Sequence, residues 1–117
     1  MSKSLNYEIT GTNFKLSEAN RSYVSRKIEK LIDYIPKKVR ESARAEVRVE
    51  ELDTKTPEKF GVNILLSLPG KELIAKEAGL DPQSAVDLAE VKIRGQLRKY
   101  KTENSVIRRI RKFAKRG

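Results

Sequence analysis

Alternating apolar and polar residues predict four β-strands along the chain. Within each segment the apolar side chains recur at every second position, as on a strand with one buried face. The predicted strands lie within residues 5–10, 44–50, 60–68 and 71–78. Gly11-Thr12-Asn13 is expected to end the first strand, and Asp53–Glu58 to form a loop after the second. Pro69-Gly70 fits the central positions of a type II turn between the last two strands.

Helical spacing of apolar residues predicts two long helices, one after the first strand and one after the last. The first covers residues 18–35, takes Ser17 as its N-cap residue and stops before Pro36. The second begins at Asp81-Pro82, where the aspartate is expected to cap and the proline to occupy the first helical position. Its buried stripe comprises Val86, Ala89, Ile93, Leu97 and Tyr100.

The resulting order β-α-β-β-β-α indicates one α+β domain. Sequential strands usually lie side by side, and a strand–helix–strand crossover is right-handed. We therefore expect a two-layer sandwich, in which a four-stranded mixed sheet of order 1-2-3-4 carries both helices on one face. Its first two strands would be parallel, and its other face would be open and carry mixed charges. A chain of 117 residues is long enough for one such domain and too short for two.

Positive charge is concentrated at the C-terminal end of the chain. Residues 1–91 contain 15 Lys or Arg and 15 Asp or Glu, whereas residues 92–117 contain 11 Lys or Arg and one acidic residue, Glu103. The last part of the chain therefore accounts for the whole net charge of +10. A segregated positive field attracts polyanions, so we favour a nucleic-acid partner over a surface that only aids solubility.

Basic residues form ridges on both predicted helices. The ridges beside the buried stripe of the second helix are Lys92, Gln96 and Lys99 on one side, and Arg94, Arg98 and Lys101 on the other. The helix dipole favours cations in the last turn but does not account for Lys92 and Arg94. On the first helix the ridge is Tyr23, Lys27, Lys30 and Tyr34. Its tyrosines either stack on unpaired bases or cover the core and reach water with their tips.

A basic tail follows Lys101. Its apolar residues fall at helical spacing and alternate with basic ones, which predicts a short amphipathic helix capped by Asn104 or Ser105. The cations of this tail that we take as candidate RNA ligands are Arg108, Arg109, Arg111 and Lys112. An isolated helix of this length is marginal in water, so we expect it to fray unless it packs against the domain or a ligand.

The residue types that carry most catalytic and metal chemistry are absent. Without Cys or His, the chain has no disulfide, no zinc–thiolate site and no histidine base. Glu50, Glu51 and Asp53 could hold magnesium in a nuclease, but Arg48 beside Glu50 is typical of an ordinary exposed strand. We expect no catalytic residue, metal site or cofactor. The chain also lacks a long apolar run and a signal-peptide core, which indicates a cytoplasmic protein without a membrane partner.

Four segments within about residues 5–101 resemble one known family, in order and at that family's spacing. They are ITGTNFKLSEANRSYVSRKIEKL (9–31), LPGKELIAKEAG (68–79), the helix start with Asp81 and Ala85-Val86-Asp87, and QLRKYK (96–101). The family is that of the ribosome hibernation-promoting factors, also called ribosome-associated inhibitors or sigma modulation proteins. With 16 residues after Lys101, the chain resembles a short form.

This resemblance implies a fold similar to a double-stranded RNA-binding domain and a specific partner. That partner is the small ribosomal subunit with its 16S-type ribosomal RNA, bound in the channel for messenger RNA and for A-site and P-site transfer RNA. Occupancy of the channel would stop translation and stabilise inactive ribosomes without catalysing a reaction. We expect the protein to be monomeric away from the ribosome.

The resemblance also implies which residues face RNA. Carried over position by position, they are Arg21, Lys27 and Lys30 on the first helix, and Lys92, Arg98, Lys99 and Lys101 on the second. We add Arg94 for its charge, although the family has a small or acidic residue there. Gly95 stands where family members commonly have a basic residue, so contact at this point is expected to differ.

The predicted organisation is a ribosome-binding domain over residues 1–101 and a basic tail over residues 102–117. Three alternatives stay open at this point. The chain could be a stand-alone double-stranded RNA-binding module, because element order and charge fit one. Its tail could instead dock on an acidic protein or lipid surface, or the carboxylates could form the metal-dependent nuclease site.

Overall fold

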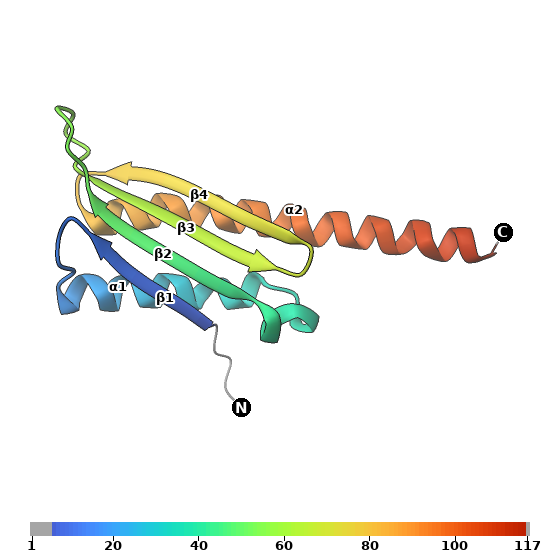
Figure 1. The fold of residues 1–117 in the computed structure, drawn as a ribbon. Coiled ribbons are helices and arrows are strands. Elements are labelled where there is room, and N and C mark those ends of the chain that lie inside the picture. The colour runs from blue at the N-terminus through green and yellow to red at the C-terminus, as the bar shows by residue number, and fades with distance from the viewer. Residues whose placement is uncertain (1–5, 117) are drawn as a thin grey trace.

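The chain folds into two layers, a sheet and a pair of helices. The computed structural model describes residues 6–116, with the backbone alone for residues 103–116. The elements are β1 (Asn6–Thr12), α1 (Glu18–Lys30), η1 (Leu31–Tyr34), η2 (Lys37–Ser42), β2 (Arg44–Glu51), β3 (Phe60–Leu68), β4 (Lys71–Gly79) and α2 (Pro82–Arg116), where η denotes a 3₁₀ helix. The strands form one sheet of order β1-β2-β3-β4, and both α-helices lie on the same face of it (Figure 1). The predicted α+β sandwich is confirmed.

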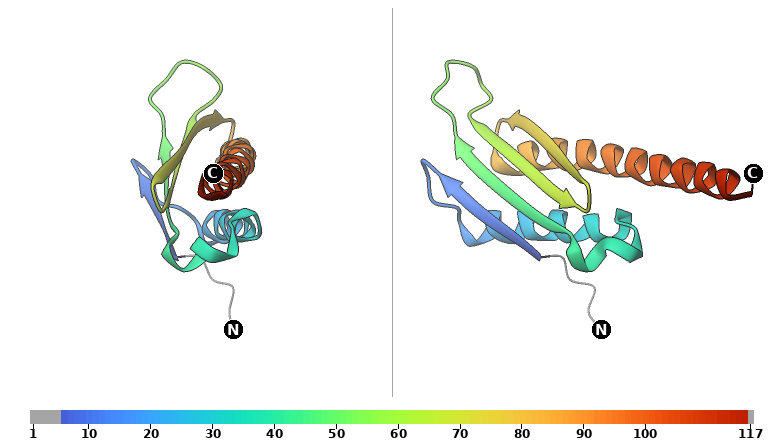
Figure 2. Two further views of the ribbon diagram at one scale, coloured as in Figure 1. Left: turned by 90° about the vertical axis from the view of Figure 1, so that its right-hand side faces the viewer. Right: turned by 45° about the vertical axis from the view of Figure 1, so that its right-hand side comes forward.

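Strand register brings the apolar positions together on the side facing the helices. β1 pairs with β2 in parallel and sets Ile9 opposite Val47. The antiparallel pairs β2–β3 and β3–β4 continue that row through Ile64 and Ala75. The side chains of Val47, Ile64 and Ala75 are buried. Figure 2 shows the two layers end-on, with the helices on one side of the sheet only.

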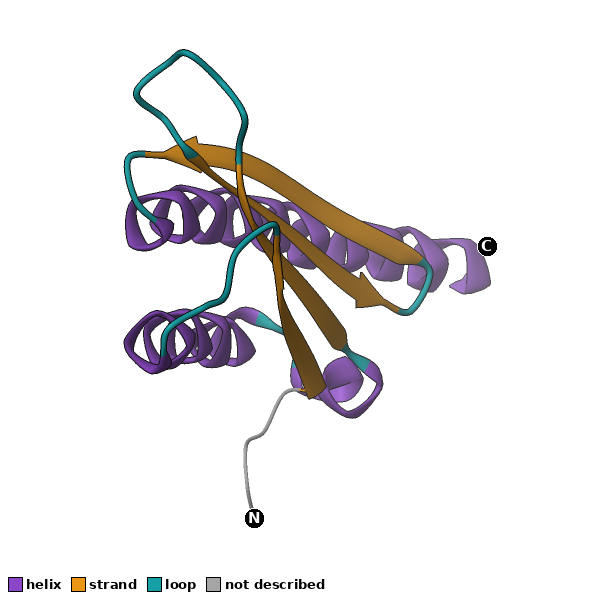
Figure 3. Cartoon of the chain, turned by 60° about the vertical axis from the view of Figure 1, so that its left-hand side comes forward, coloured by secondary structure: helices purple, strands orange, loops and turns teal. Residues whose placement is uncertain are grey.

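The helix layer completes the core. Val24 and Ile28 of α1 and Ile93 and Leu97 of α2 are fully buried against the sheet. Burying one such aliphatic side chain contributes about 1.5–3 kcal/mol. The opposite face of the sheet stays uncovered, as predicted, and the loop between β2 and β3 extends beyond the sheet (Figure 3).

Both predicted N-caps are confirmed. The Ser17 side-chain oxygen accepts a hydrogen bond from the Asn20 backbone N–H at 3.0 Å. Asp81 Oδ1 accepts one from the Ser84 backbone N–H at 2.7 Å, and this hydrogen bond lowers the pKa of Asp81. A carboxylate at this place also faces the positive end of the α2 dipole.

Glycine is required at two bends of the chain. Gly70 has φ of 76°, as the second central position of a type II turn requires, so the predicted turn is confirmed. A Cβ on Gly79 would lie 2.8 Å from the Ala85 nitrogen and 3.0 Å from the Ser84 Cβ. Only glycine therefore lets the first turn of α2 pack against the end of β4.

The predicted helix over residues 18–35 is too long. The α-helix ends at Lys30, and the chain tightens into η1 before Ile35 turns to extended backbone. Pro36 explains the change, since the residue before a proline disfavours the helical region. The tighter turn also buries the neighbouring residues Leu31 and Ile32 together. The second 3₁₀ helix, η2, was not predicted at all.

The prediction that Gly11-Thr12-Asn13 ends β1 is wrong by two residues. Gly11 and Thr12 still pair with Val49 and Glu50 of β2. The strand leaves the sheet only at Asn13, whose positive φ of 66° marks the bend.

The tail does not form a separate helix capped at Asn104 or Ser105. α2 runs without interruption for 35 residues from Pro82 to Arg116, about 52 Å at the usual rise per residue. Its C-terminal part continues beyond the end of the sheet (Figure 1). Helical spacing on both sides of residues 102–105 allows one continuous helix, because no proline or glycine interrupts it there. The expected fraying stays a prediction.

Candidate nucleic-acid interface

The two α-helices run side by side in the same direction. Tyr23 of α1 contacts Asp87 near the start of α2, and Tyr34 of η1 contacts Arg94 further along it. Asp87, near the start of α2, therefore lies beside the middle of α1, and Arg94 lies beside η1, beyond the end of α1. Among the described side chains of α2, the acidic residues come first and the cations from Lys92 to Lys101 follow towards the C-terminal end.

Asp87 joins the two helices at the acidic end of α2. Its carboxylate accepts hydrogen bonds from the Tyr23 hydroxyl at 2.8 and 3.0 Å, and Lys27 Nζ lies 3.3 Å from Oδ1. The hydrogen bond to Asp87 raises the pKa of Tyr23, and the one from Lys27 raises the pKa of that lysine. Tyr23 therefore behaves as a boundary residue with a satisfied hydroxyl, and the charge of Lys27 is largely balanced within the protein.

Arg94 is held by two neighbours. Its Nε lies 3.1 Å from Oε2 of Glu90, in the geometry of a close ion pair, and one terminal nitrogen donates to the Tyr34 hydroxyl at 3.4 Å. The guanidinium also lies over the Tyr34 ring, 5.6 Å from its centroid. The Tyr34 hydroxyl, followed by the Glu90 carboxylate, raises the pKa of Arg94. Glu90 is only 4% exposed, so Arg94 is the counter-ion of a buried carboxylate.

The other flank of α2 faces the edge strand β4. Lys92 forms an ion pair with Glu77, and Gln96 Nε2 donates to the Ile74 carbonyl at 2.9 Å. These contacts confirm that Lys92 and Gln96 share a ridge opposite Arg94. They also show that Lys92, like Lys27 and Arg94, has a carboxylate partner inside the protein.

The remaining predicted cations within the domain are exposed. Arg21 is partly engaged, because it donates to the Ile9 carbonyl at 3.1 Å. Among the residues whose side chains the structure describes, no ion pair involves the exposed cations Lys30, Arg98, Lys99 and Lys101. Three of these four lie in the consecutive turns of α2 nearest the projecting tail, so they form the strongest candidate surface for phosphate.

The predicted RNA ligands of the tail and two further lysines extend the exposed basic surface around Lys101. Arg108, Arg109, Arg111 and Lys112 belong to α2, and their side chains lie outside the described part of the structure. Two further exposed lysines, Lys37 and Lys38 of η2, follow the end of η1 and were not among the predicted candidates. The signal was present as a pair of lysines directly after Pro36.

A shallow groove separates the helices where charge changes sign. It encloses about 360 Å³ and is lined by Lys27, Lys30, Asp33, Tyr34, Glu90 and Arg94. Because acidic and basic side chains both line the groove, the groove marks the edge of the basic surface and is not part of it. A tyrosine covered by Arg94 on one face does not present an open stacking platform, which favours the boundary-residue interpretation for Tyr34 too.

Neither a metal-binding cluster nor a membrane-spanning helix occurs in the part of the chain that the structure describes. Within residues 6–116, no three acidic side chains described by the structure come together in a way that could hold a metal ion, and this includes Glu50, Glu51 and Asp53. In the same part of the chain, no helix combines the length and apolarity needed to cross a membrane.

Comparison with known proteins decides the family. The family described as "Sigma 54 modulation protein / S30EA ribosomal protein" matches residues 7–105. The chain belongs to this family. A ribosome hibernation promotion factor of Lactococcus lactis is 31% identical over 98 residues, which cover 84% of this chain and 50% of the relative. One of Bacillus subtilis is 31% identical over 113 residues, covering 97% of this chain and 54% of the relative. The chain thus spans about half the length of these curated relatives.

Solved structures of similar proteins confirm the sigma 54 modulation protein fold. The N-terminal domain of Thermus thermophilus Protein Y superposes with a TM-score of 0.68 at 24% identity, covering 83% of this chain and 99% of that domain. A ribosomal subunit interface protein from Coxiella burnetii gives a TM-score of 0.66 at 24% identity, covering 84% and 99% of the two chains. These matches do not support the alternative of a stand-alone double-stranded RNA-binding module.

Proposed function

We propose that this chain binds the small ribosomal subunit in the channel for messenger RNA and for A-site and P-site transfer RNA, and stabilises inactive ribosomes. The observation that carries the proposal is the exposed group Lys30, Arg98, Lys99 and Lys101, without ion-pair partners among the described side chains, on a domain of this family. Ribosomal RNA offers phosphates as partners for such cations. The names of the curated relatives and of the Coxiella burnetii protein support the ribosome as the target.

The proposed mechanism is occupancy. A domain seated on ribosomal RNA in the decoding channel excludes messenger and transfer RNA by volume, so translation stops without a chemical step. No bond is made or broken, and neither a catalytic residue nor a cofactor is required. The protein would act in the cytoplasm, where ribosomes are.

The C-terminal part of α2 is proposed to extend the RNA-binding surface beyond the domain. Residues 102–117 carry six basic residues against Glu103, on a helix that leaves the domain next to Lys101. From Lys101 to Arg116 this segment reaches about 22 Å along its axis. We infer that residues 1–101 form the ribosome-binding domain and that the tail adds contacts to ribosomal RNA beyond it.

Co-sedimentation with vacant small subunits over a salt series tests both the electrostatic interface and the contribution of the tail. If roughly eight phosphates are neutralised, affinity should fall by about three to five decades between about 50 and 200 mM salt. Deleting residues 103–117 should weaken binding and flatten the dependence of log affinity on log salt. Retention that is independent of salt would contradict the electrostatic interface. Unchanged affinity and slope after the deletion would remove the tail from it.

A further inference from the structure

The sheet face opposite the helices has its own ordered pattern of side chains. Strand pairing aligns Glu8, Glu46, Leu65 and Ile74 in one row across the four strands. The adjacent row contains Thr10, Arg48, Asn63 and Lys76. The first row therefore joins two carboxylates to two apolar side chains, and the second carries two cations separated by an amide.

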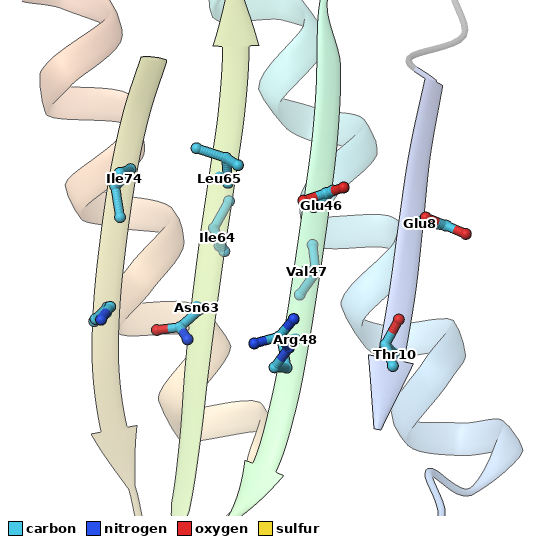
Figure 4. A pocket seen from close by; sticks show the side chains of 10 residues that line it. Glu8, Thr10, Glu46, Val47, Arg48, Asn63, Ile64, Leu65 and Ile74 are labelled. Atoms are coloured by element: carbon cyan, nitrogen blue, oxygen red, sulfur yellow. The ribbon is translucent and has the colours of Figure 1, made fainter. Parts of the chain in front are cut away.

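These two rows surround a hollow of about 370 Å³. Figure 4 shows Glu8 and Glu46 at one side of it, Leu65 and Ile74 at the other, and Arg48 and Asn63 below. The hollow lies over β1 to β4 on the open face, whereas the basic surface lies on the helix layer. The two surfaces are therefore on opposite sides of the domain (Figure 2).

Glu8 and Glu46 form a like-charged pair without an ion-pair partner among the described side chains, although Arg48 and Lys76 line the adjacent row of the same hollow. They are direct partners in the parallel β1–β2 register, and neighbouring strands lie about 4.8 Å apart. Like charges in this arrangement destabilise a sheet. Within residues 6–102, where side chains are described, no Lys or Arg forms an ion pair with either carboxylate. A cation brought by a partner would relieve this repulsion.

Leu65 and Ile74 supply the apolar half of the hollow. They are direct partners in the β3–β4 register, and Ile74 is 53% exposed although it lies in the middle of a strand. An apolar side chain covering this pair would gain from burial of the exposed isoleucine. The centre of this pair and that of the glutamate pair lie two strand spacings apart, about 10 Å.

We propose that this hollow is a second interaction surface, and that it takes a segment of a ribosomal protein of the small subunit. The segment would present a Lys or Arg to Glu8 and Glu46 and an apolar side chain to Leu65 and Ile74. RNA is the poorer occupant of the first row, because the paired carboxylates repel phosphate and the apolar pair offers it no hydrogen bond, although Arg48 and Lys76 line the second row. The inference rests on the proposed function: with the helix layer against ribosomal RNA, the sheet is the face left for subunit protein.

Glu46→Lys distinguishes a protein partner at the hollow from simple attraction of a basic protein to RNA. The substitution makes the protein more basic, so a partner that is purely RNA should bind it as tightly as the original protein or more tightly. We expect instead that affinity for intact small subunits falls about tenfold, the loss of one interfacial ion pair. Affinity for protein-free small-subunit RNA should not fall. Glu58→Lys, in the exposed β2–β3 loop, adds the same charge away from the hollow and is the matched control.

A benzophenone photo-cross-linker at position 74 provides a second readout. On purified small subunits it should give an adduct that survives ribonuclease and is lost with protease. An RNA adduct, an adduct with a second copy of this chain, or no adduct would overturn the proposal. So would Glu46→Lys binding intact subunits as tightly as the original protein. Failure of the original protein to bind subunits would instead refute the proposed function itself.

Discussion

Replacing Arg94 by methionine should lower the free energy of unfolding by about 3 kcal/mol, since breaking a buried ion pair leaves an uncompensated charge. The charge in question is the Glu90 carboxylate, 4% exposed and 3.1 Å from the Arg94 Nε. Arg94 itself is 29% exposed at its side chain, so the expected loss lies at the lower end of the range for such pairs. Urea unfolding followed by circular dichroism measures it.

Arg98→Met is the matched control for this experiment. Arg98 lies one turn further along the same helix and is exposed, with no ion pair among the described side chains. Its replacement should change stability by less than about 0.5 kcal/mol. The double variant Glu90→Gln/Arg94→Met should recover most of the stability lost in Arg94→Met, because the buried charge is gone. Equal stability of Arg94→Met and Arg98→Met would show that Arg94 is not the counter-ion described above.

Reversing two exposed cations of α2 should have the largest effect on binding. The variant Arg98→Glu/Lys101→Glu should bind vacant small subunits roughly 100-fold more weakly, if each lost charged hydrogen bond contributes about 1.5 kcal/mol. The dependence of log affinity on log salt should also fall by about two, one for each lost phosphate contact. Co-sedimentation over the salt series gives both quantities.

Two exposed lysines at the opposite end of the domain provide the control for this reversal. Lys15 lies in the β1–α1 connection and Lys55 in the β2–β3 loop. Both of these connections are at the end of the sheet away from the one where α2 leaves the domain (Figure 1). Lys15→Glu/Lys55→Glu changes net charge by the same amount. If both double variants lose equal affinity, only net charge matters and the interface has no defined place on the helix layer.

The order of elements could be predicted because local pattern and tertiary structure agree in this chain. Alternation in Ala45, Val47 and Val49 matches a strand with one buried face, and these residues are buried on β2. The Asp81-Pro82 start of α2 is determined by local capping chemistry. Sheet order followed from the short connections between β2, β3 and β4.

The charge partners could not be predicted, because they lie far apart in sequence. Lys27 pairs with Asp87 and Lys92 with Glu77 only after the helices and sheet have assembled. From the sequence, all the cations of each ridge were predicted to be RNA ligands. The fold divides them: Arg94 supports the buried Glu90, whereas Arg98 on the same ridge remains exposed.

The charged residues of the helix layer fall into two groups, one paired within the protein and one exposed. Asp87 binds Lys27 and so joins α2 to α1, whereas Glu90 binds Arg94 within α2 itself. Further along, Arg98, Lys99 and Lys101 meet no acidic side chain among those described. We infer that the acidic end of α2 stabilises the domain and that its basic end is left for the ribosome.

Competition for the decoding channel tests the central claim most directly. Labelled protein is added to small subunits that are either vacant or loaded with messenger RNA and P-site transfer RNA, and bound protein is measured after sedimentation. Occupancy of the same channel predicts strict competition, with the apparent dissociation constant rising in proportion to the concentration of the loaded ligands. Stable subunits that carry the protein, messenger RNA and transfer RNA together would contradict the account.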